Sequence, residues 1–241
     1  MTITSPHNEK LKQIRKLTHQ RRAREQAGRF VAEGEDLLAA ADAAGWPALE
    51  RYCVAGSGLG GTEVEPELLS AASALGSGTR MLGVFEERWA PAPAGPLCVY
   101  LHGIHDPGNV GAVLRSAQAF GASCIAVGPG TADPYGPKAV RASMGSLFGV
   151  PLARASGEPG ELPGETVALV AGAGVALGEL FASCAPPAIT IVVGSERDGL
   201  PDELTAAADH VAHIPILTHS LNAAMAATVA LYELTHRILA R

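Results

Sequence analysis

The polar residues best placed to do chemistry lie in three short segments, each of which directly follows an apolar run. The segments are residues 103–109, 194–201 and 214–222. Arg115 lies about one and a half helical turns beyond the first segment, off the apolar stripe of the helix expected there. A guanidinium beside a glycine-containing turn is well placed to hold an anion. The first segment therefore predicts an anion-binding site, with Asn109 as a suitable cap for the helix.

The second and third segments hold residue types that suit ligand binding but are common in α/β proteins. Gly194 and Gly199 allow a backbone to approach a ligand closely, and Pro201 suits the first position of a helix. Ser220 could cap the alanine-rich helix that follows, and Asn222 could be an exposed residue of its first turn. The density of alanine in that helix also hints at close contact with another subunit.

The elements that position these segments follow from the hydrophobic pattern. Apolar runs at residues 97–101, 124–127, 166–170, 189–193 and 211–214 alternate with helical segments. Continuous apolar strands separated by helices are typical of a parallel sheet covered by helices on both faces. In such sheets ligands bind beyond the carboxyl ends of the strands. We therefore expect the three polar segments to share one edge of the sheet.

A smaller α/β unit precedes this sheet. Short strands are expected at residues 29–32, 51–55 and 81–85, with one helix at 33–44 and another beginning near Pro66. Residues 91–96 contain three prolines, through which neither a helix nor a central strand can run. The predicted domains are residues 1–90 and 97–241, joined by a linker at 91–96.

Charge is unevenly distributed along the chain. The whole chain has a formal net charge of -6, yet residues 1–30 hold eight basic and two acidic residues. Leu11, Ile14 and Leu17 recur at helical spacing there, which predicts a cationic helix with a narrow apolar stripe. The basic residues form either a solvated face of this helix or an arm that binds nucleic-acid phosphates. The candidate RNA-binding residues are Lys10, Lys12, Arg15, Lys16, Arg21, Arg22 and Arg24.

Composition excludes several classes of protein. The chain has 241 residues, of which 47% are hydrophobic and 17% charged, so a soluble globular protein is expected. Neither a signal-peptide core nor a stretch of about 20 apolar residues is present, so we expect a cytoplasmic location and no membrane partner. The four cysteines lie far apart and are predicted to be small buried apolar residues.

Nucleotide-binding and metal motifs are also missing from the sequence. No P-loop pattern is found, and the glycine-rich residues 172–178 place the last glycine of a dinucleotide fingerprint one position late. His102 with His105, and His210 with His213, have loose metal-ligand spacing but lack a convincing third ligand. We therefore predict no metal site.

In their order and spacing, the three segments resemble the signature motifs of the SpoU (TrmH) family of RNA ribose 2'-O-methyltransferases. The matching stretches are residues 106–117, 193–200 and 214–222, with a further similar segment at 141–146. Residues 30–34, after the basic helix, resemble the start of the substrate-binding domain that many members carry. The sequence departs from the family pattern at Arg197, Ile216 and residues 223–225. The resemblance covers nearly the whole chain.

The resemblance implies a parallel α/β sheet with a carboxyl-terminal trefoil knot, a homodimer, and S-adenosylmethionine as cofactor. On matching positions, Gly194, Ile214 and Leu221 would hold the cofactor. The expected catalytic residues are Arg115, Asn109, Glu196, Ser220 and Asn222. General topology rules do not predict a knot, which enters by resemblance alone.

The resemblance gives Arg115 the central role in methyl transfer to a ribose 2'-hydroxyl. A guanidinium stays protonated in proteins, so we interpret Arg115 as a clamp on the target phosphate and a stabiliser of oxyanion charge, with the phosphate or a water accepting the proton. Ribosomal RNA is the favoured substrate. A transfer-RNA methyltransferase, a resistance methylase and a non-catalytic ribosome-binding or assembly factor with the same fold remain alternatives.

Overall fold

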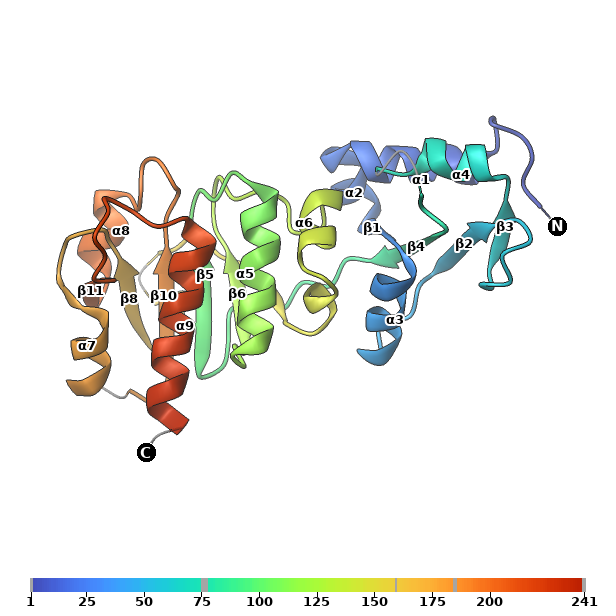
Figure 1. Cartoon of the computed structure of the whole chain (residues 1–241). Coiled ribbons are helices and arrows are strands. Elements are labelled where there is room, and N and C mark those ends of the chain that lie inside the picture. Colours follow the sequence, from blue (N-terminus) through green and yellow to red (C-terminus); the bar gives the residue numbers. More distant parts are fainter. Residues whose placement is uncertain (1, 75–77, 159, 184–185, 240–241) are drawn as a thin grey trace. The chain divides into compact units, whose positions relative to one another are not determined.

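The computed structural model describes residues 2–74, 78–158, 160–183 and 186–239, which form two compact units (Figure 1). One unit comprises residues 1–87 together with 133–149, and the other comprises residues 88–132 together with 150–241. The structure differs from the predicted division, because residues 88–96 belong to the second unit. Residues 133–149, expected in the second domain, pack within the amino-terminal unit.

The amino-terminal unit is a four-stranded sheet with helices. Its helices are α1 (Glu9–His19), α2 (Arg21–Ala27), α3 (Glu35–Ala43), α4 (Pro66–Ala72) and α6 (Pro137–Ala142), with a 3-10 turn, η1 (Ser146–Phe148). Its strands are β1 (Arg29–Glu33), β2 (Glu50–Val54), β3 (Thr62–Val64) and β4 (Met81–Glu86), in the order β1-β4-β2-β3. The β1/β4 and β2/β4 pairs are antiparallel, and β2/β3 is parallel.

The predicted apolar stripe of the basic segment is confirmed. Leu11, Ile14 and Leu17 are buried in one core cluster with Leu69 of α4. The segment is not one helix, however, because Gln20 adopts an extended conformation, with φ of -125°, and separates α1 from α2.

An aromatic cluster holds residues 133–149 in this unit. The ring of Phe30 on β1 lies 4.8 Å from that of Tyr135 and 6.1 Å from that of Phe148, measured between centroids. Phe148 also packs edge-on against Trp46, at 5.4 Å. Burial of large rings is a strong source of packing energy, which explains why this distant segment joins the unit.

The carboxyl-terminal unit is a seven-stranded, wholly parallel sheet, as predicted. Its strands are β5 (Leu97–Leu101), β6 (Cys124–Val127), β7 (Leu152–Arg154), β8 (Glu165–Leu169), β9 (Val175–Ala176), β10 (Ile189–Val193) and β11 (His210–His213), in the order β7-β6-β5-β10-β8-β11-β9. Its helices are α5 (Pro107–Ala119), α7 (Leu177–Ser183), α8 (Asp202–Ala207) and α9 (Ala223–Leu239).

Helices cover both faces of this sheet. Leu204 of α8 packs on the cluster that contains Tyr100 and Val192, whereas α5 and α9 lie side by side on the other face (Figure 1). Ser116 Oγ of α5 and Thr228 Oγ1 of α9 are 2.6 Å apart and join the two helices. The trefoil knot stays a prediction.

Two further predictions concern cysteines and membrane spans. Cys53, Cys98 and Cys124 are buried free thiols, as expected, and Cys184 lies outside the described residues. Among the described helices, none combines the length and apolarity needed to cross a bilayer.

Candidate active site

The three polar segments follow β5, β10 and β11, whose carboxyl ends lie at the same edge of the parallel sheet. The backbone N–H of His102, the first residue after β5, donates to Val193 O at the end of β10, at 2.9 Å. The loops that leave these two strands therefore begin side by side, as the strand pattern predicts.

A chain of polar side chains joins the three segments. Asn222 Nδ2 donates to Asn109 Oδ1 at 3.0 Å, and Asn109 Nδ2 donates in turn to the carboxylate of Glu196. Asn222 Oδ1 accepts the backbone N–H of Ala224 at 2.9 Å and of Met225 at 3.3 Å. The structure thus brings together three of the predicted catalytic residues, one from each segment.

The residues that cap α5 and α9 differ from those expected from the sequence. The N-cap of α5 is Asp106, whose Oδ1 accepts the backbone N–H of Gly108 at 2.6 Å, and Asn109 lies within the first helical turn. Because Asp106 already binds a free backbone donor of that turn, the amide of Asn109 bonds to the other two segments instead. At α9 the capping contacts are made by Asn222 rather than Ser220.

A cavity of about 200 Å³ lies beside this chain of side chains. It is lined by the three residues predicted to hold the cofactor, Gly194, Ile214 and Leu221, and by Glu196 and Ser220. Its other lining residues come from the ends of β8, β10 and β11, from the 194–199 turn, from Ile216 and from the start of α9. The predicted cofactor residues and two of the predicted catalytic residues therefore line one cavity.

The turn at 194–199 forms one wall of the cavity. Ser195 and Gly199 exchange backbone hydrogen bonds of 3.0 and 3.2 Å, and Ser195 Oγ accepts the backbone N–H of Asp198 at 3.0 Å. A Cβ at Gly194 would lie 2.3 Å from the carbonyl carbon of Gly199. Only glycine fits at Gly194 without opening the turn.

Arg115 is not brought into this cavity. Its side chain is exposed on α5, and the described residues give it no hydrogen bond or ion pair within the chain. Ser116, the next residue on the helix, points to α9 instead. An exposed cation without an internal partner is available to a ligand or to another subunit.

His102, whose spacing with His105 is that of a loose metal-ligand pair, is a polar residue near the site. Tyr100 Oη lies 2.9 Å from Ser156 O and 3.1 Å from His102 Nδ1. Because a carbonyl can only accept, the tyrosine hydroxyl donates to Ser156, and His102 Nδ1–H donates to the tyrosine oxygen. Burial lowers the pKa of His102 and raises that of Tyr100 to about 12. Burial therefore favours the neutral form of the His102 imidazole, and with Nδ1–H as donor its lone pair lies on Nε2.

Most candidate RNA-binding cations of α1 and α2 are exposed, and several have partners on the surface. Lys10 pairs with Glu50 at 2.7 Å, Lys12 with Glu9 at 2.7 Å and Arg21 with Glu25 at 2.8 Å, while Arg15 donates to Pro6 O at 2.8 Å. Such exposed pairs contribute little stability. Lys16 and Arg22 are exposed as well.

Arg24 is the exception, and its predicted role in RNA binding is wrong for this structure. Its side chain is 6% exposed and pairs with Asp133 at 2.7 Å. The guanidinium also donates to Leu17 O at 2.7 Å. Every side of Arg24 is thus bound to the protein, so a phosphate cannot reach it.

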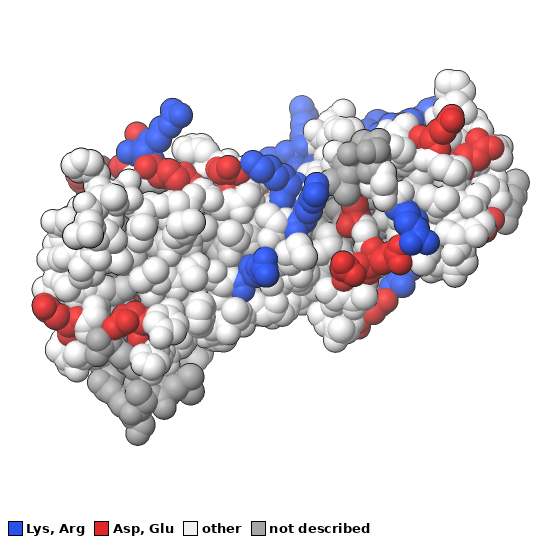
Figure 2. All heavy atoms as spheres, in the orientation of Figure 1, with Lys and Arg blue, Asp and Glu red and all other residues white. Residues whose placement is uncertain are grey.

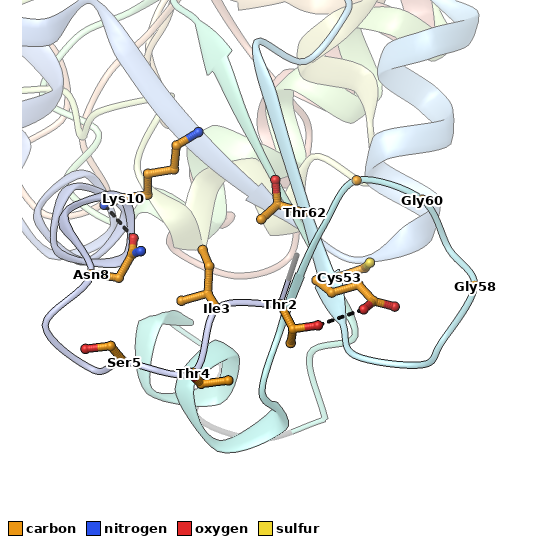
Figure 3. Close-up of a pocket in the computed structure, with 12 residues that line it drawn as sticks. Thr2, Ile3, Thr4, Ser5, Asn8, Lys10, Cys53, Gly58, Gly60 and Thr62 are labelled. Carbon is orange, nitrogen blue, oxygen red and sulfur yellow. Dashed lines mark hydrogen bonds between the residues drawn. The ribbon is translucent and has the colours of Figure 1, made fainter.

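A wider hollow, of about 890 Å³, lies in the amino-terminal unit (Figure 3). Figure 3 shows Thr2 and Ile3 running beside Thr62, with glycines 58 and 60 in the facing loop. Thr2 Oγ1 donates to Glu63 at 2.9 Å, and the Asn8 side chain accepts the backbone N–H of Lys10 at 2.9 Å. The polar groups are used within the wall, so we assign no chemistry to this hollow.

No cluster of three or more potential metal ligands occurs among the residues that the structure describes.

Comparison with known proteins assigns both parts of the chain. Residues 96–232 match the SpoU rRNA Methylase family, and residues 8–87 match the MRM3-like substrate binding domain. The 23S rRNA (uridine(2479)-2'-O)-methyltransferase of Streptomyces viridochromogenes is 36% identical over 53% of this chain and 48% of its own length. The match thus spans about half of that relative.

Two other proteins match over almost their whole length. The 23S rRNA (guanosine(2553)-2'-O)-methyltransferase RlmP of Bacillus subtilis is 25% identical over 96% of this chain and 98% of its own. The crystal structure of an AdoMet-bound rRNA methyltransferase from Sinorhizobium meliloti has a TM-score of 0.84 and 30% identity, and the match covers 99% of this chain and 98% of that one. This chain belongs to the SpoU rRNA methylase family and carries an MRM3-like substrate binding domain ahead of the family's methylase domain.

Proposed function

We propose that this protein transfers a methyl group from S-adenosylmethionine to a ribose 2'-hydroxyl of ribosomal RNA. The observation that carries the proposal is the meeting of Asn109, Glu196 and Asn222 beside a cavity lined by Gly194, Ile214 and Leu221. The relatives named above methylate 2'-hydroxyls of 23S rRNA, at a uridine in one case and a guanosine in the other. The target nucleotide therefore differs within the family.

The cavity fits S-adenosylmethionine by its chemistry. Ile214, Ile216 and Leu221 offer apolar surface, and the backbone of the 194–199 turn approaches without side chains at Gly194 and Gly199. Its volume of about 200 Å³ is below the roughly 300–1,000 Å³ of common ligand pockets. The exposed residues Glu196, Arg197 and Ser220 in its wall leave it open, so a cofactor would extend into the open rim.

When bound, S-adenosylmethionine supplies an electrophilic methyl group. The protein must then place the ribose oxygen in line with that group, and such positioning supplies much of the rate acceleration. Asn109 and Ser220 orient the nucleotide in this proposal, while Glu196 and Asn222 brace the loops. Arg115 binds the target phosphate and stabilises the developing oxyanion, and the phosphate or a water accepts the proton.

A homodimer accounts for the position of Arg115. Met225, Val229 and Tyr232 of α9 are 61%, 38% and 52% exposed and recur at i, i+4 and i+7, which places them on one face. Figure 2 shows that neither acidic nor basic side chains cover most of the surface around α9. A second copy of the chain packed on this apolar stripe would bring its exposed Arg115, on the neighbouring α5, towards the first copy's cavity.

The amino-terminal unit is proposed to bind the RNA. Its exposed cations on α1 and α2, Lys16 and Arg22 among them, suit contacts with phosphates, whose strength falls as salt rises.

The direct test compares Arg115→Ala with Gln118→Ala, a control at another exposed position of α5. Transfer of a tritiated methyl group to protein-free 23S rRNA is measured, and the 2'-O-methyl position is mapped. Arg115→Ala should lower the rate of methyl transfer at least about 100-fold, because in other enzymes the loss of one donor to a developing oxyanion lowers the rate by about that factor. Calorimetry should show unchanged S-adenosylmethionine binding. A parent protein that transfers no methyl group to ribosomal RNA contradicts the proposal, and lost cofactor binding in Arg115→Ala contradicts the role of the arginine.

A further inference from the structure

Residues 133–149 complete the amino-terminal unit although they follow the first motif of the catalytic sequence. The match to the substrate-binding domain ends at residue 87, yet this later segment packs in the same compact unit. The buried Arg24–Asp133 ion pair holds the segment at its start, and Tyr135 and Phe148 pack on Phe30. A segment held at both ends presents its middle part in a defined place.

The middle of the segment presents an apolar side chain in a strained conformation. Met144 has φ of +49° and is the only non-glycine residue with positive φ among the residues that the structure describes. It is 60% exposed, whereas its neighbours Ser143 and Ser146 are 0% and 4% exposed. Glycine or asparagine would adopt this conformation at lower cost. Backbone outliers of this kind concentrate at ligand-binding sites.

The packing of the next residue fixes this conformation. Gly145 also has positive φ, of +92°, and a Cβ there would lie 2.6 Å from Cβ of Ala40 on α3. The backbone is therefore pressed against α3 directly after Met144, and the methionine side chain is turned outwards.

Met144 forms part of the wall of a hollow of about 480 Å³ that also includes Arg141. Arg141 is exposed and lies in the last turn of α6. The hollow is therefore bounded on the α6 side by an apolar side chain and a cation.

The opposite wall is acidic but largely paired. Glu33 accepts hydrogen bonds from Ser73 Oγ and the backbone N–H of Ala74, both at 2.6 Å. Glu35 pairs with Arg80 at 3.2 Å. Asp36 adds a further negative charge to this wall. A phosphate is thus favoured on the α6 side of the hollow and disfavoured on the α3 side.

We propose that this hollow binds an unpaired nucleotide of the RNA substrate, with its base against Met144 and its phosphate at Arg141. Unpaired bases are the parts of RNA that proteins contact by stacking, and a thioether makes favourable contacts with aromatic rings. Apolar side chains, methionine among them, also insert between bases of nucleic acids. This inference rests on the proposed function and adds a binding site for a flanking nucleotide.

The test measures binding of protein-free 23S rRNA and of a fully paired RNA duplex. Met144→Gly removes the side chain and relieves the strain, and Met144→Leu keeps an apolar side chain. Leu49→Ala is the control, since Leu49 is another exposed apolar residue of the same unit. Met144→Gly should raise the Kd for 23S rRNA about five- to tenfold, in the range of one lost base contact. Its Tm should be equal to or above the parent's. The Kd values of Met144→Leu and Leu49→Ala for 23S rRNA should stay within about twofold of the parent's.

Arg141→Gln tests the phosphate contact. The logarithm of the association constant falls linearly with the logarithm of the salt concentration. Arg141→Gln should make this slope less steep by about 0.7, the value for one phosphate contact on a single strand. A slope equal to the parent's contradicts the contact. If Met144→Gly binds 23S rRNA within twofold of the parent, the base contact is wrong.

The same experiments separate this inference from the proposed function. A parent that methylates ribosomal RNA, with Met144→Gly binding as tightly, overturns only the nucleotide site. A parent that binds 23S rRNA through Met144 but transfers no methyl group overturns only the reaction. A parent that binds the duplex as tightly as 23S rRNA overturns the nucleotide site.

Discussion

Two arginines of α2, two positions apart, have opposite surroundings. Arg22 is exposed, whereas the guanidinium of Arg24 is enclosed by Asp133 and the carbonyl of Leu17. Arg24→Ala would leave the carboxylate of Asp133, 13% exposed, without its partner. Breaking a buried pair by removing one partner costs about 3–5 kcal/mol. We therefore expect a loss of that size in the free energy of unfolding, measured by urea denaturation.

Arg22→Ala is the matched comparison. It should change stability by no more than about 0.5 kcal/mol, as is usual for surface positions. Instead it should weaken 23S rRNA binding and reduce its salt dependence. If Arg24→Ala unfolds at the same urea concentration as the parent, the buried ion pair is not stabilising. If Arg22→Ala leaves the salt slope unchanged, α2 does not contact RNA phosphates.

The difference between Arg22 and Arg24 illustrates which features of the site can be predicted from the sequence and which cannot. The resemblance to the SpoU family singles out Asn109, Glu196 and Asn222, and the apolar runs that precede their segments predict that the three lie at one edge of the sheet. The role of Arg24 was not predictable, because its partner lies 109 positions away in the chain. The cap at Asp106 was missed because both Asp106 and Asn109 are good cap residues and local sequence does not choose between them.

At the scale of elements, the turn after β10 must keep its two glycines for different reasons. Gly194 has no room for a Cβ, since one would lie 2.4 Å from Gly199 O. Gly199 has φ of +69° but nothing within 4 Å of a Cβ. Gly194→Ala should therefore open the turn and reduce S-adenosylmethionine affinity at least about tenfold, by calorimetry.

Gly199→Ala provides the contrast. It introduces only the strain of a left-handed alanine, which costs about 1 kcal/mol, and should reduce cofactor affinity less than Gly194→Ala does. Equal losses in the two variants would show that close packing at Gly194 does not shape the cavity.

Long apolar elements were the predictable ones. The five expected strands of the parallel sheet correspond to β5, β6, β8, β10 and β11, whereas β7 and β9 are three and two residues long and carry no periodicity. The break between α1 and α2 is not predictable from residue type, because Gln20 is a good helix former and yet has an extended backbone.

At the scale of the whole molecule, the division into two units depends on contacts that no local pattern contains. Residues 133–149 were expected in the catalytic domain because they follow its first motif in the chain. They join the other unit through Tyr135 and Phe148, whose partner Phe30 lies more than 100 positions earlier. Membership of a unit is thus decided by burial of a few large side chains.

The proposed dimer belongs to this scale too. A glutamate in place of Val229 would put a charge in the centre of the exposed stripe of α9, and burying an unpaired charge is costly. Light scattering should show the parent at twice the 24.7 kDa of one chain and Val229→Glu at the single-chain mass. Ala206→Glu, at an exposed position of α8, is the control and should leave the mass unchanged. A parent with the single-chain mass would contradict the dimer.

Mixed subunits then show whether Arg115 acts across the dimer. At an S-adenosylmethionine concentration far below the Kd of Gly194→Ala, Arg115→Ala and Gly194→Ala are each expected to be nearly inactive alone, because one lacks the cation and the other lacks cofactor affinity. If the arginine of one copy serves the cavity of the other, a mixed dimer has one intact site, because one subunit supplies the cavity and its partner supplies the arginine. Random exchange of equal amounts should then restore about one quarter of parental methyl transfer, since half of the dimers are mixed and each has one working site of two. If both groups act within one chain, every site in the mixture lacks one of them and activity stays absent.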